Sequence, residues 1–311
     1  MEQIIELVVP SFAKINWVLR VFDKRDDGYH RLETIYQTID LRDEITFKIT
    51  SDSMISLRVC GKEVARGRDN IVYKAAELLK RATAVNKGVE ICLKKQIPIG
   101  AGLGGGSGNA AVVLLVLNKL WECGLSKKEL SCLASQLGSD VPFFLFGGTA
   151  LGLERGEKII PFVDQLQEQK LLLFYPGFQL STRKAYSLLQ QKNHKKERTL
   201  TEEDVNNTMQ RLHETISQKT GNWSFLQNDF EDVLFERYPV LDDVRRRLTM
   251  AGCRMVMLCG SGSTLLALGV TQEMSEMVEP ILRETGSEGF FCQTLSRERY
   301  TKFINQSIHL I

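Results

Sequence analysis

The sequence predicts an α+β fold in two parts, with an N-terminal domain over residues 1–160 and a C-terminal domain over residues 161–311. Three observations predict it. A strand, a glycine-rich loop and a buried helix follow one another between residues 89 and 121. Strictly alternating residues at 12–21 add a strand before this unit. After residue 170, an apolar strand, short helices and a glycine turn between two strands form a second group of elements.

Residues 12–21 alternate apolar and polar side chains, which is typical of a strand with one buried face. This alternation places Lys14, Asn16 and Val18 on the polar face and Leu19 on the apolar face. Two interpretations of Lys14 are open. It is either a solubilising charge on the solvent side, which spacing alone favours, or a functional cation.

A polar loop at residues 23–30 contains the turn signal Asp27-Gly28 and precedes strands expected at 32–39 and 44–50. Tyr29 and His30 lie at the loop's exit. Either Tyr29 packs and His30 faces solvent, or the two hold a nucleobase by stacking and edge hydrogen bonds. The residues alone favour the first interpretation.

Residues 98–109 contain six glycines among twelve residues, between a strand expected at 89–94 and an apolar helix expected at 110–121. Glycines let backbone N–H groups turn inward with positive φ, and a helix N-terminus adds a positive dipole end. We therefore predict a phosphate-binding backbone in preference to a surface turn. The loop has neither the Gly-Lys-[Ser/Thr] ending of a P-loop nor the acidic residue of a dinucleotide fingerprint.

Capping residues predict where the helices on either side of this unit begin. Asn70 is expected to cap a helix over 71–84, and a capping box at Ser126 and Glu129 opens a helix that ends at Gly138. This second helix leads to Asp140, which precedes Val141-Pro142. Asp140 is either the N-cap of the next helix or a functional carboxylate. A strand and turn at 151–157 then lead to the domain boundary near residue 160.

In the second half, Ser181 or Thr182 is expected to cap a helix that ends near residue 191. Residues 192–207 are polar and predict a solvated loop. Helices beginning near 228 and 240 precede a strand at 254–258, a turn at 259–264 and an apolar segment at 265–268. A tight glycine hairpin is the simplest interpretation of that turn.

The composition excludes several classes of protein. The 311 residues include 40 basic and 38 acidic side chains, a net charge of +2, so we expect no nucleic-acid or membrane partner. Seven cysteines form no Cys-x-x-Cys pair, which argues against a disulfide framework and a structural zinc site. With no long apolar run and no targeting pattern at Met1, we expect a cytoplasmic protein, a monomer or weak homodimer.

Three ordered motifs resemble the GHMP small-molecule kinases. They are Phe12-Ala13-Lys14-Ile15-Asn16 with Asp27-Gly28-Tyr29-His30, the loop beginning at Pro98, and Gly138-Ser139-Asp140-Val141-Pro142. The first is similar to the branch of the family that phosphorylates diphosphocytidyl methylerythritol in the non-mevalonate isoprenoid pathway. A fourth motif, Ser-Gly-Ser-Gly in the family, begins here with Cys259, so its first hydroxyl is missing while the backbone of Gly260 to Gly262 is retained.

The resemblance implies an enzyme that transfers the γ-phosphoryl group of ATP to the C2 hydroxyl of that substrate, with Mg²⁺ as cofactor. It implies that Asp140 accepts the hydroxyl proton, and that Lys14 counters phosphoryl charge and keeps Asp140 ionised. Ser107 is the expected Mg²⁺ ligand. The expected ATP-binding residues are Asn70, Pro98, Ile99, Gly100, Ala101, Gly102, Leu103, Gly104, Gly105, Gly106, Ser107 and Gly108. The expected substrate-binding residues are Asn16, Tyr29, His30, Thr182, Gly260, Ser261 and Gly262.

Two other functions remain open at this stage. One is a different GHMP kinase that acts on homoserine or mevalonate, in which Tyr29 and His30 have no base to bind. The other is a non-catalytic nucleotide sensor with the same fold, which needs neither Lys14 nor Asp140.

Overall fold

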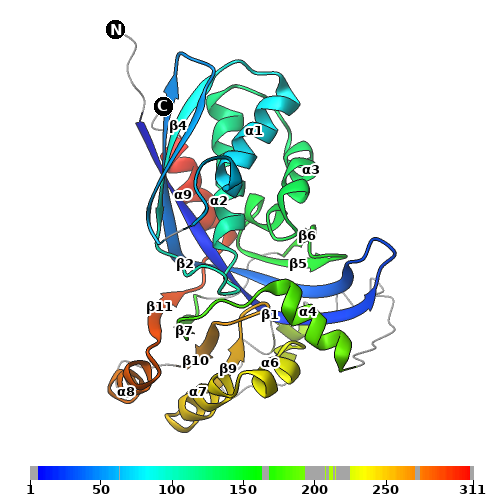
Figure 1. Cartoon of the computed structure of the whole chain (residues 1–311), viewed down its shortest axis with the longest axis vertical. Helices are drawn as coiled ribbons and strands as arrows, with labels where there is room; N and C mark the ends of the chain where they lie inside the picture. Colours follow the sequence, from blue (N-terminus) through cyan, green and yellow to red (C-terminus); the bar gives the residue numbers. More distant parts are fainter. Residues whose placement is uncertain are drawn as a thin grey trace.

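The structure is a computed structural model that describes residues 6–62, 64–162, 168–192, 207, 210–212, 214, 225–269 and 274–308. It contains two β-sheets, each with its own helices (Figure 1). The larger sheet has the order β3-β4-β2-β1-β8, and β5 pairs with β2 and with β6. Its strands are β1 (Glu6–Lys24), β2 (His30–Thr50), β3 (Ile55–Gly61), β4 (Gly88–Lys95), β5 (Thr149–Leu153), β6 (Lys158–Pro161) and β8 (Gln227–Asn228).

Three helices lie side by side on one face of the larger sheet (Figure 1): α1 (Ile71–Thr83), α2 (Gly105–Leu120) and α3 (Lys127–Leu137). Helices α1 and α2 contact the sheet, and α3 packs on α1 and α2. Helix α2 is the central one, and nearly all of its residues from Gly108 to Leu117 are buried. It is apolar on almost every side because it packs against the sheet and against α1, α3 and the short helix η2 (Pro142–Leu145). Burial of this helix fixes the position of the loop that precedes it.

The predicted helix boundaries are confirmed at α1 and α3 and are wrong at α2. Asn70 caps α1 by accepting a hydrogen bond from the backbone N–H of Val72 at 2.9 Å, and Ser126 and Glu129 form the expected capping box. Helix α2, however, begins at Gly105 and not at residue 110. The second half of the glycine-rich segment is therefore its first turn, because buried neighbours override the low helix propensity of glycine.

Two predictions about the first strands also need correction. The strands expected at 32–39 and 44–50 are one continuous strand, β2. In β1, the pairing with β2 shifts between Asn16 and Val18, so Trp17 is an extra residue and the alternation reverses beyond it. As a result Leu19, rather than Val18, shares the cleft-facing side with Lys14 and Asn16.

The smaller sheet has the order β11-β7-β10-β9 and consists of β7 (Lys170–Tyr175), β9 (Met255–Leu258), β10 (Leu265–Leu268) and β11 (Glu288–Gln293). Around it lie α4 (Thr182–Gln191), α6 (Glu231–Arg237), α7 (Pro239–Met250) and α8 (Ser275–Thr285). The glycine turn between β9 and β10 forms an antiparallel hairpin as predicted. Ser181 occupies the predicted N-cap position of α4, but its side chain makes no capping hydrogen bond.

The two halves are connected by more than one segment. Strand β8 pairs in parallel with β1, and α9 (Arg297–Ile308) packs on the N-terminal core, where Tyr300 contacts the ring of Phe12. The division at residue 160 remains a prediction, because these later segments belong by packing to the first half.

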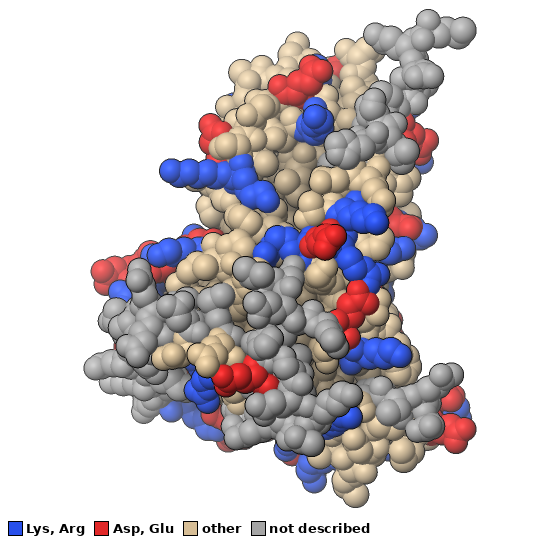
Figure 2. Space-filling model, turned by 180° about the vertical axis from the view of Figure 1, so that it is seen from behind, with Lys and Arg blue, Asp and Glu red and all other residues tan. Residues whose placement is uncertain are grey.

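The expected solvated loop at 192–207 lies, apart from its two end residues, outside the described residues. Within the described part of the chain, no helix has the length and apolar composition needed to cross a membrane. On the face shown in Figure 2, basic and acidic side chains are interspersed, as the nearly balanced net charge implies.

Candidate active site

A cleft of about 950 Å³ is lined by residues from both halves of the molecule. It brings together every predicted site residue except Gly108 and Gly262. Gly108 packs on β1 instead, since a Cβ there would lie 2.7 Å from the carbonyl oxygen of Phe12. Gly262 faces the apolar core of the C-terminal half, where a Cβ would lie 2.9 Å from the side chain of Leu180. These two glycines allow close packing and do not face the cleft.

The glycine-rich loop enters the cleft in a conformation that needs glycine at specific positions. Gly102 has a φ of 80°, and Gly104, the N-cap of α2, has a φ of 66°. A Cβ at Gly102 would collide with the carbonyl oxygen of Cys259, so the loop lies directly against the β9–β10 turn. The loop is thus fixed between β1, where Lys14 N–H donates to the oxygen of Leu103 at 2.9 Å, and the second half of the molecule.

Asp43 makes hydrogen bonds to the segments on both sides of this loop. Its buried carboxylate accepts hydrogen bonds from the backbone N–H of Gln96 at 2.7 Å and Ile97 at 2.9 Å, just before the loop. It also accepts one from Asn109 in α2 at 2.9 Å and forms an ion pair with Lys95. Burial lowers the pKa of Lys95, and the Asp43 charge opposes that shift. No local sequence pattern indicates this network, because its members are far apart in the chain.

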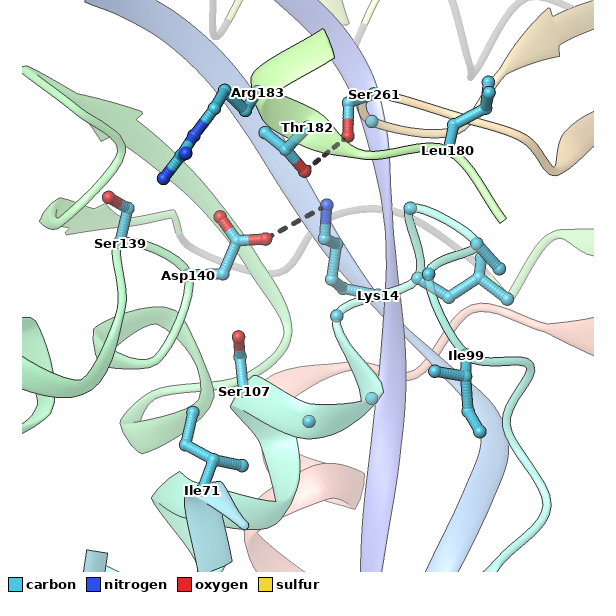
Figure 3. Close-up of a pocket in the computed structure, with 18 of the residues that line it drawn as sticks. Lys14, Ile71, Ile99, Ser107, Ser139, Asp140, Leu180, Thr182, Arg183 and Ser261 are labelled. Carbon is cyan, nitrogen blue, oxygen red and sulfur yellow. Dashed lines mark hydrogen bonds and ion pairs between the residues drawn. The ribbon is translucent and has the colours of Figure 1, made fainter. Parts of the chain in front are cut away.

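Lys14 and Asp140 form the charged centre of the cleft. Lys14 Nζ lies 3.4 Å from Asp140 Oδ2 (Figure 3). It also donates to Asn16 Oδ1 at 2.7 Å. The side chain of Lys14 is only 4% exposed, so the interpretation of a solubilising surface charge is wrong. Asp140 is 33% exposed and therefore accessible from the cleft.

A tyrosine missed by the sequence analysis holds the other oxygen of Asp140. Tyr36 OH donates to Asp140 Oδ1 at 2.9 Å, and its ring stacks on Phe143 with centroids 4.8 Å apart. Burial, together with the Asp140 charge, raises the pKa of Tyr36 well above its ordinary value, so the phenol stays a hydrogen-bond donor. Tyr36 pairs with Asn16 across β1 and β2, a relation that needed the strand register.

The capping interpretation of Asp140 is not realised. In the described chain the N-cap of η2 is Val141, which makes no side-chain capping bond. Ser107, in the first turn of α2, lies on the opposite side of Asp140 from α4 in Figure 3. The carboxylate is thus directed into the cleft between the start of α2 and the start of α4.

Aromatic side chains gather at the far end of the cleft. His30 stacks on Tyr186 of α4, with centroids 5.2 Å apart and an interplanar angle of 17°, and its Nε2 lies 3.0 Å from Gln190 Nε2. Tyr29 is 54% exposed, and the guanidinium of Arg155 lies 4.8 Å from its ring centroid. The interpretation of Tyr29 as a packed residue is wrong. Tyr186 was missed because nothing near it in the sequence marks it.

The β9–β10 turn closes the cleft from the second half. Ser261 Oγ lies 2.9 Å from Thr182 Oγ1, and Asn228 donates to the carbonyl oxygen of Gly260 at 2.7 Å. Cys259 is completely buried, which raises the pKa of its thiol to about 12. Its side chain belongs to the apolar core and does not line the cleft.

Comparison with known proteins fits this geometry. Residues 70–148, from the α1 cap to the start of β5, match the model of the GHMP kinases N terminal domain. The 4-diphosphocytidyl-2-C-methyl-D-erythritol kinase of Thermodesulfovibrio yellowstonii is 39% identical over 262 residues, which cover 84% of this chain and 89% of that protein. The enzyme of the same name from Pelotomaculum thermopropionicum is 37% identical, covering 91% and 96%.

The chain belongs to the 4-diphosphocytidyl-2-C-methyl-D-erythritol kinase family. A crystal structure of 4-(cytidine 5'-diphospho)-2C-methyl-D-erythritol kinase superimposes with a TM-score of 0.72 at 32% identity, covering 93% of this chain and 99% of that one. The homoserine kinase of Cytophaga hutchinsonii has a TM-score of 0.66 at 15% identity, covering 95% and 96%, which shows a shared fold alone. The predicted α+β GHMP kinase fold is confirmed, and the chain is a kinase that uses ATP.

Proposed function

We propose that this chain transfers the γ-phosphoryl group of ATP to the C2 hydroxyl of 4-diphosphocytidyl-2-C-methyl-D-erythritol, giving its 2-phosphate and ADP. The observation that supports it is a single cleft with three parts: a glycine loop at a helix N-terminus, the Lys14–Asp140 pair, and an aromatic end at His30 and Tyr186. The family relationship supports the same substrate.

The nucleotide phosphates bind at the start of α2 in this proposal. Gly102 to Ser107 present backbone N–H groups there, where the first-turn donors of a helix have no partner within the helix and favour anions. Asn70, at the cap of α1, and Pro98 line the same end of the cleft and flank the adenosine. Gly104 must stay without a side chain, since a Cβ there would lie 2.9 Å from Lys14.

The acceptor hydroxyl lies against Asp140. As the acceptor hydroxyl oxygen attacks the γ-phosphorus of ATP, Asp140 takes the proton of that hydroxyl. The bond between the γ-phosphorus and the β–γ bridging oxygen breaks, and ADP leaves with that oxygen. Tyr36 and Lys14 hold the two carboxylate oxygens, which orients the base before the substrate arrives. The Lys14 ammonium also neutralises charge on the phosphoryl oxygens in transit.

The residues present fit a magnesium ion that is held mainly by phosphate oxygens. Among the described residues, no group of three or more His, Cys, Asp or Glu side chains could hold a metal by itself. Mg²⁺ in phosphoryl-transfer sites keeps several waters and binds through substrate phosphates and few protein groups, of which a serine hydroxyl can be one. Ser107 supplies a hydroxyl in the first turn of α2. The ion would supply charge neutralisation on the β- and γ-phosphates.

The aromatic end of the cleft holds the cytosine in this proposal. Tyr29 offers an exposed ring face to the base, beside the stacked rings of His30 and Tyr186. Both ring nitrogens of His30 already have partners, the carbonyl oxygen of Phe22 and the amide of Gln190, and these contacts hold the imidazole in place at this end of the cleft. Homoserine and mevalonate kinases act on substrates without a base, so these three side chains favour the cytidyl substrate over the other GHMP kinases. The Lys14–Asp140 pair favours an enzyme over a non-catalytic sensor.

A coupled assay of ADP release tests the proposal. Wild-type protein with ATP and Mg²⁺ is given 4-diphosphocytidyl-2-C-methyl-D-erythritol, homoserine, mevalonate or methylerythritol 4-phosphate. We expect ADP release with the cytidyl substrate alone. Comparable turnover of homoserine or mevalonate would overturn the substrate, and equal use of methylerythritol 4-phosphate would overturn the role of the base.

A further inference from the structure

One face of α4 follows the cleft from its aromatic end to its charged centre. Thr182, Arg183, Tyr186, Ser187 and Gln190 all line the cleft, a spacing of three or four residues that keeps them on one side of the helix. Gln190 and Tyr186 contact His30 at one end. At the other end Thr182 contacts Ser261, close to the Lys14–Asp140 pair (Figure 3).

Arg183 lies between these two ends. It is three residues from Tyr186 toward the start of the helix, a rise of about 4.5 Å along the axis. In Figure 3 its guanidinium extends from α4 toward Ser139 and Asp140, whereas Lys14 approaches Asp140 from the other side. No motif in the sequence marks Arg183.

The charge of Arg183 is available to a ligand. Of the other cations that line the cleft, Lys14 pairs with Asp140, Lys95 with Asp43, and Arg155 with Glu157. Arg183 forms no ion pair with a residue that the structure describes. Lys24 also lines the cleft, but it ends β1 beside the hairpin that carries Tyr29, on the side of the base.

We propose that Arg183 binds the diphosphate of the cytidyl substrate. The inference rests on the proposed function, which puts the base at Tyr186 and His30 and the acceptor hydroxyl at Asp140. In the substrate the diphosphate connects the cytidine to the methylerythritol, so it must cross the part of the cleft between those two ends. A guanidinium there can make two parallel hydrogen bonds to phosphate oxygens. Arg183 thereby selects an acceptor that carries a diphosphate.

The test compares two probes that differ only in the diphosphate. Isothermal titration calorimetry measures the affinities of CDP and cytidine for the wild type, Arg183→Ala, Arg183→Lys and Lys184→Ala. Lys184 is the matched control, since it is the next cation on α4, is exposed, and lies 5.7 Å from the ring of Tyr238 rather than in the cleft.

We expect Arg183→Ala to weaken CDP binding by ~10- to 100-fold, the range for hydrogen bonds to a charged group, with cytidine affinity unchanged. Arg183→Lys should lose less, because it keeps the charge without the planar fork. Lys184→Ala should bind both probes as the wild type does. In turnover, Arg183→Ala should raise the KM of the cytidyl substrate by the same factor, with the KM of ATP unchanged.

Three results would overturn the inference alone: unchanged CDP affinity in Arg183→Ala, an equal loss for CDP and cytidine, or an equal loss in Lys184→Ala. A fall in kcat with CDP affinity intact would also overturn it, because the guanidinium would then act on the transferred phosphoryl group. A wild type that binds neither probe would instead overturn the proposed cytidine site, and this inference with it.

Discussion

Replacement of Asp140 by Asn removes the proposed proton acceptor and little else. The amide has the same shape, and its oxygen can still accept the hydrogen bond from Tyr36 OH, which is 2.9 Å long in the wild type. It cannot take a proton from the acceptor hydroxyl. We therefore expect kcat to fall by ~10²- to 10⁴-fold, the range for a general base, or about 3–5 kcal/mol of activation free energy.

The same substitution should change stability only modestly. It breaks the ion pair with Lys14, whose Nζ lies 3.4 Å away, but Lys14 keeps its 2.7 Å hydrogen bond to Asn16. Asp140 is one-third exposed, so solvent already screens the pair. A loss of about 1 kcal/mol is expected, which corresponds to a fall of roughly 2–4 °C in Tm.

Stopped-flow or coupled ADP-release kinetics give kcat, calorimetry gives the Kd of ATP, and a thermal melt shows that the variant is folded. The Kd should stay within about threefold of wild type, since the phosphate-binding backbone is intact. Tyr36→Phe is the comparison, because it keeps the carboxylate and loses only one orienting bond; its kcat should fall by less than ~10-fold. Near-normal turnover in a folded Asp140→Asn variant would refute the role of Asp140 as base.

Three further predictions concern the loop, the aromatic end and a buried acid. Gly104→Val should abolish ATP binding, measured by calorimetry, because the φ of 66° at this position disfavours a β-branched residue and the valine side chain would meet Lys14. Normal ATP binding by this variant would mean that the phosphates bind elsewhere. Tyr29→Ala should weaken binding of the cytidyl substrate by roughly 1–3 kcal/mol and leave ATP untouched, and equal losses for both would contradict a base stack. Burial raises the pKa of Glu231 to about 7 from 4.5, so its contribution to stability is complete below pH 4.5 and disappears as the pH rises through 7. In denaturant titrations Glu231→Gln should remove up to about 3 kcal/mol of this pH dependence, whereas parallel wild-type and variant curves would show that Glu231 does not titrate there.

The site could be predicted from sequence wherever one short segment carries both the structure and the chemistry. The glycine-rich loop, the Asn70 cap and the capping box at Ser126 are local signals, and the structure has each of them. Lys14 and Asp140 were identified through family motifs, since spacing alone favoured a surface charge for the first. Their direct contact depends on tertiary packing, which no local pattern reports.

The wrong predictions also have their cause in tertiary structure. Helix α2 starts five residues earlier than expected because tertiary burial, and not propensity, decides its first turn. The extra residue at Trp17 reverses the alternation of β1, and period-2 reasoning cannot detect a bulge in advance. Tyr36, Tyr186 and Arg183 were missed because no motif marks them and only tertiary packing brings their parts of β2 and α4 to the cleft. The positive φ expected of the loop glycines does not hold at Gly105, which is helical and where a Cβ would instead meet Ile97 and Lys95.

The most direct test of the account is ³¹P NMR of the product formed from ATP and 4-diphosphocytidyl-2-C-methyl-D-erythritol. We predict one new phosphomonoester signal per ADP released, coupled to neither phosphorus of the intact diphosphate, which forms with wild-type protein and ~10²- to 10⁴-fold more slowly with Asp140→Asn. A new signal within a longer phosphate chain, a cleaved diphosphate, or ADP release without any phosphomonoester would contradict phosphoryl transfer to the C2 hydroxyl.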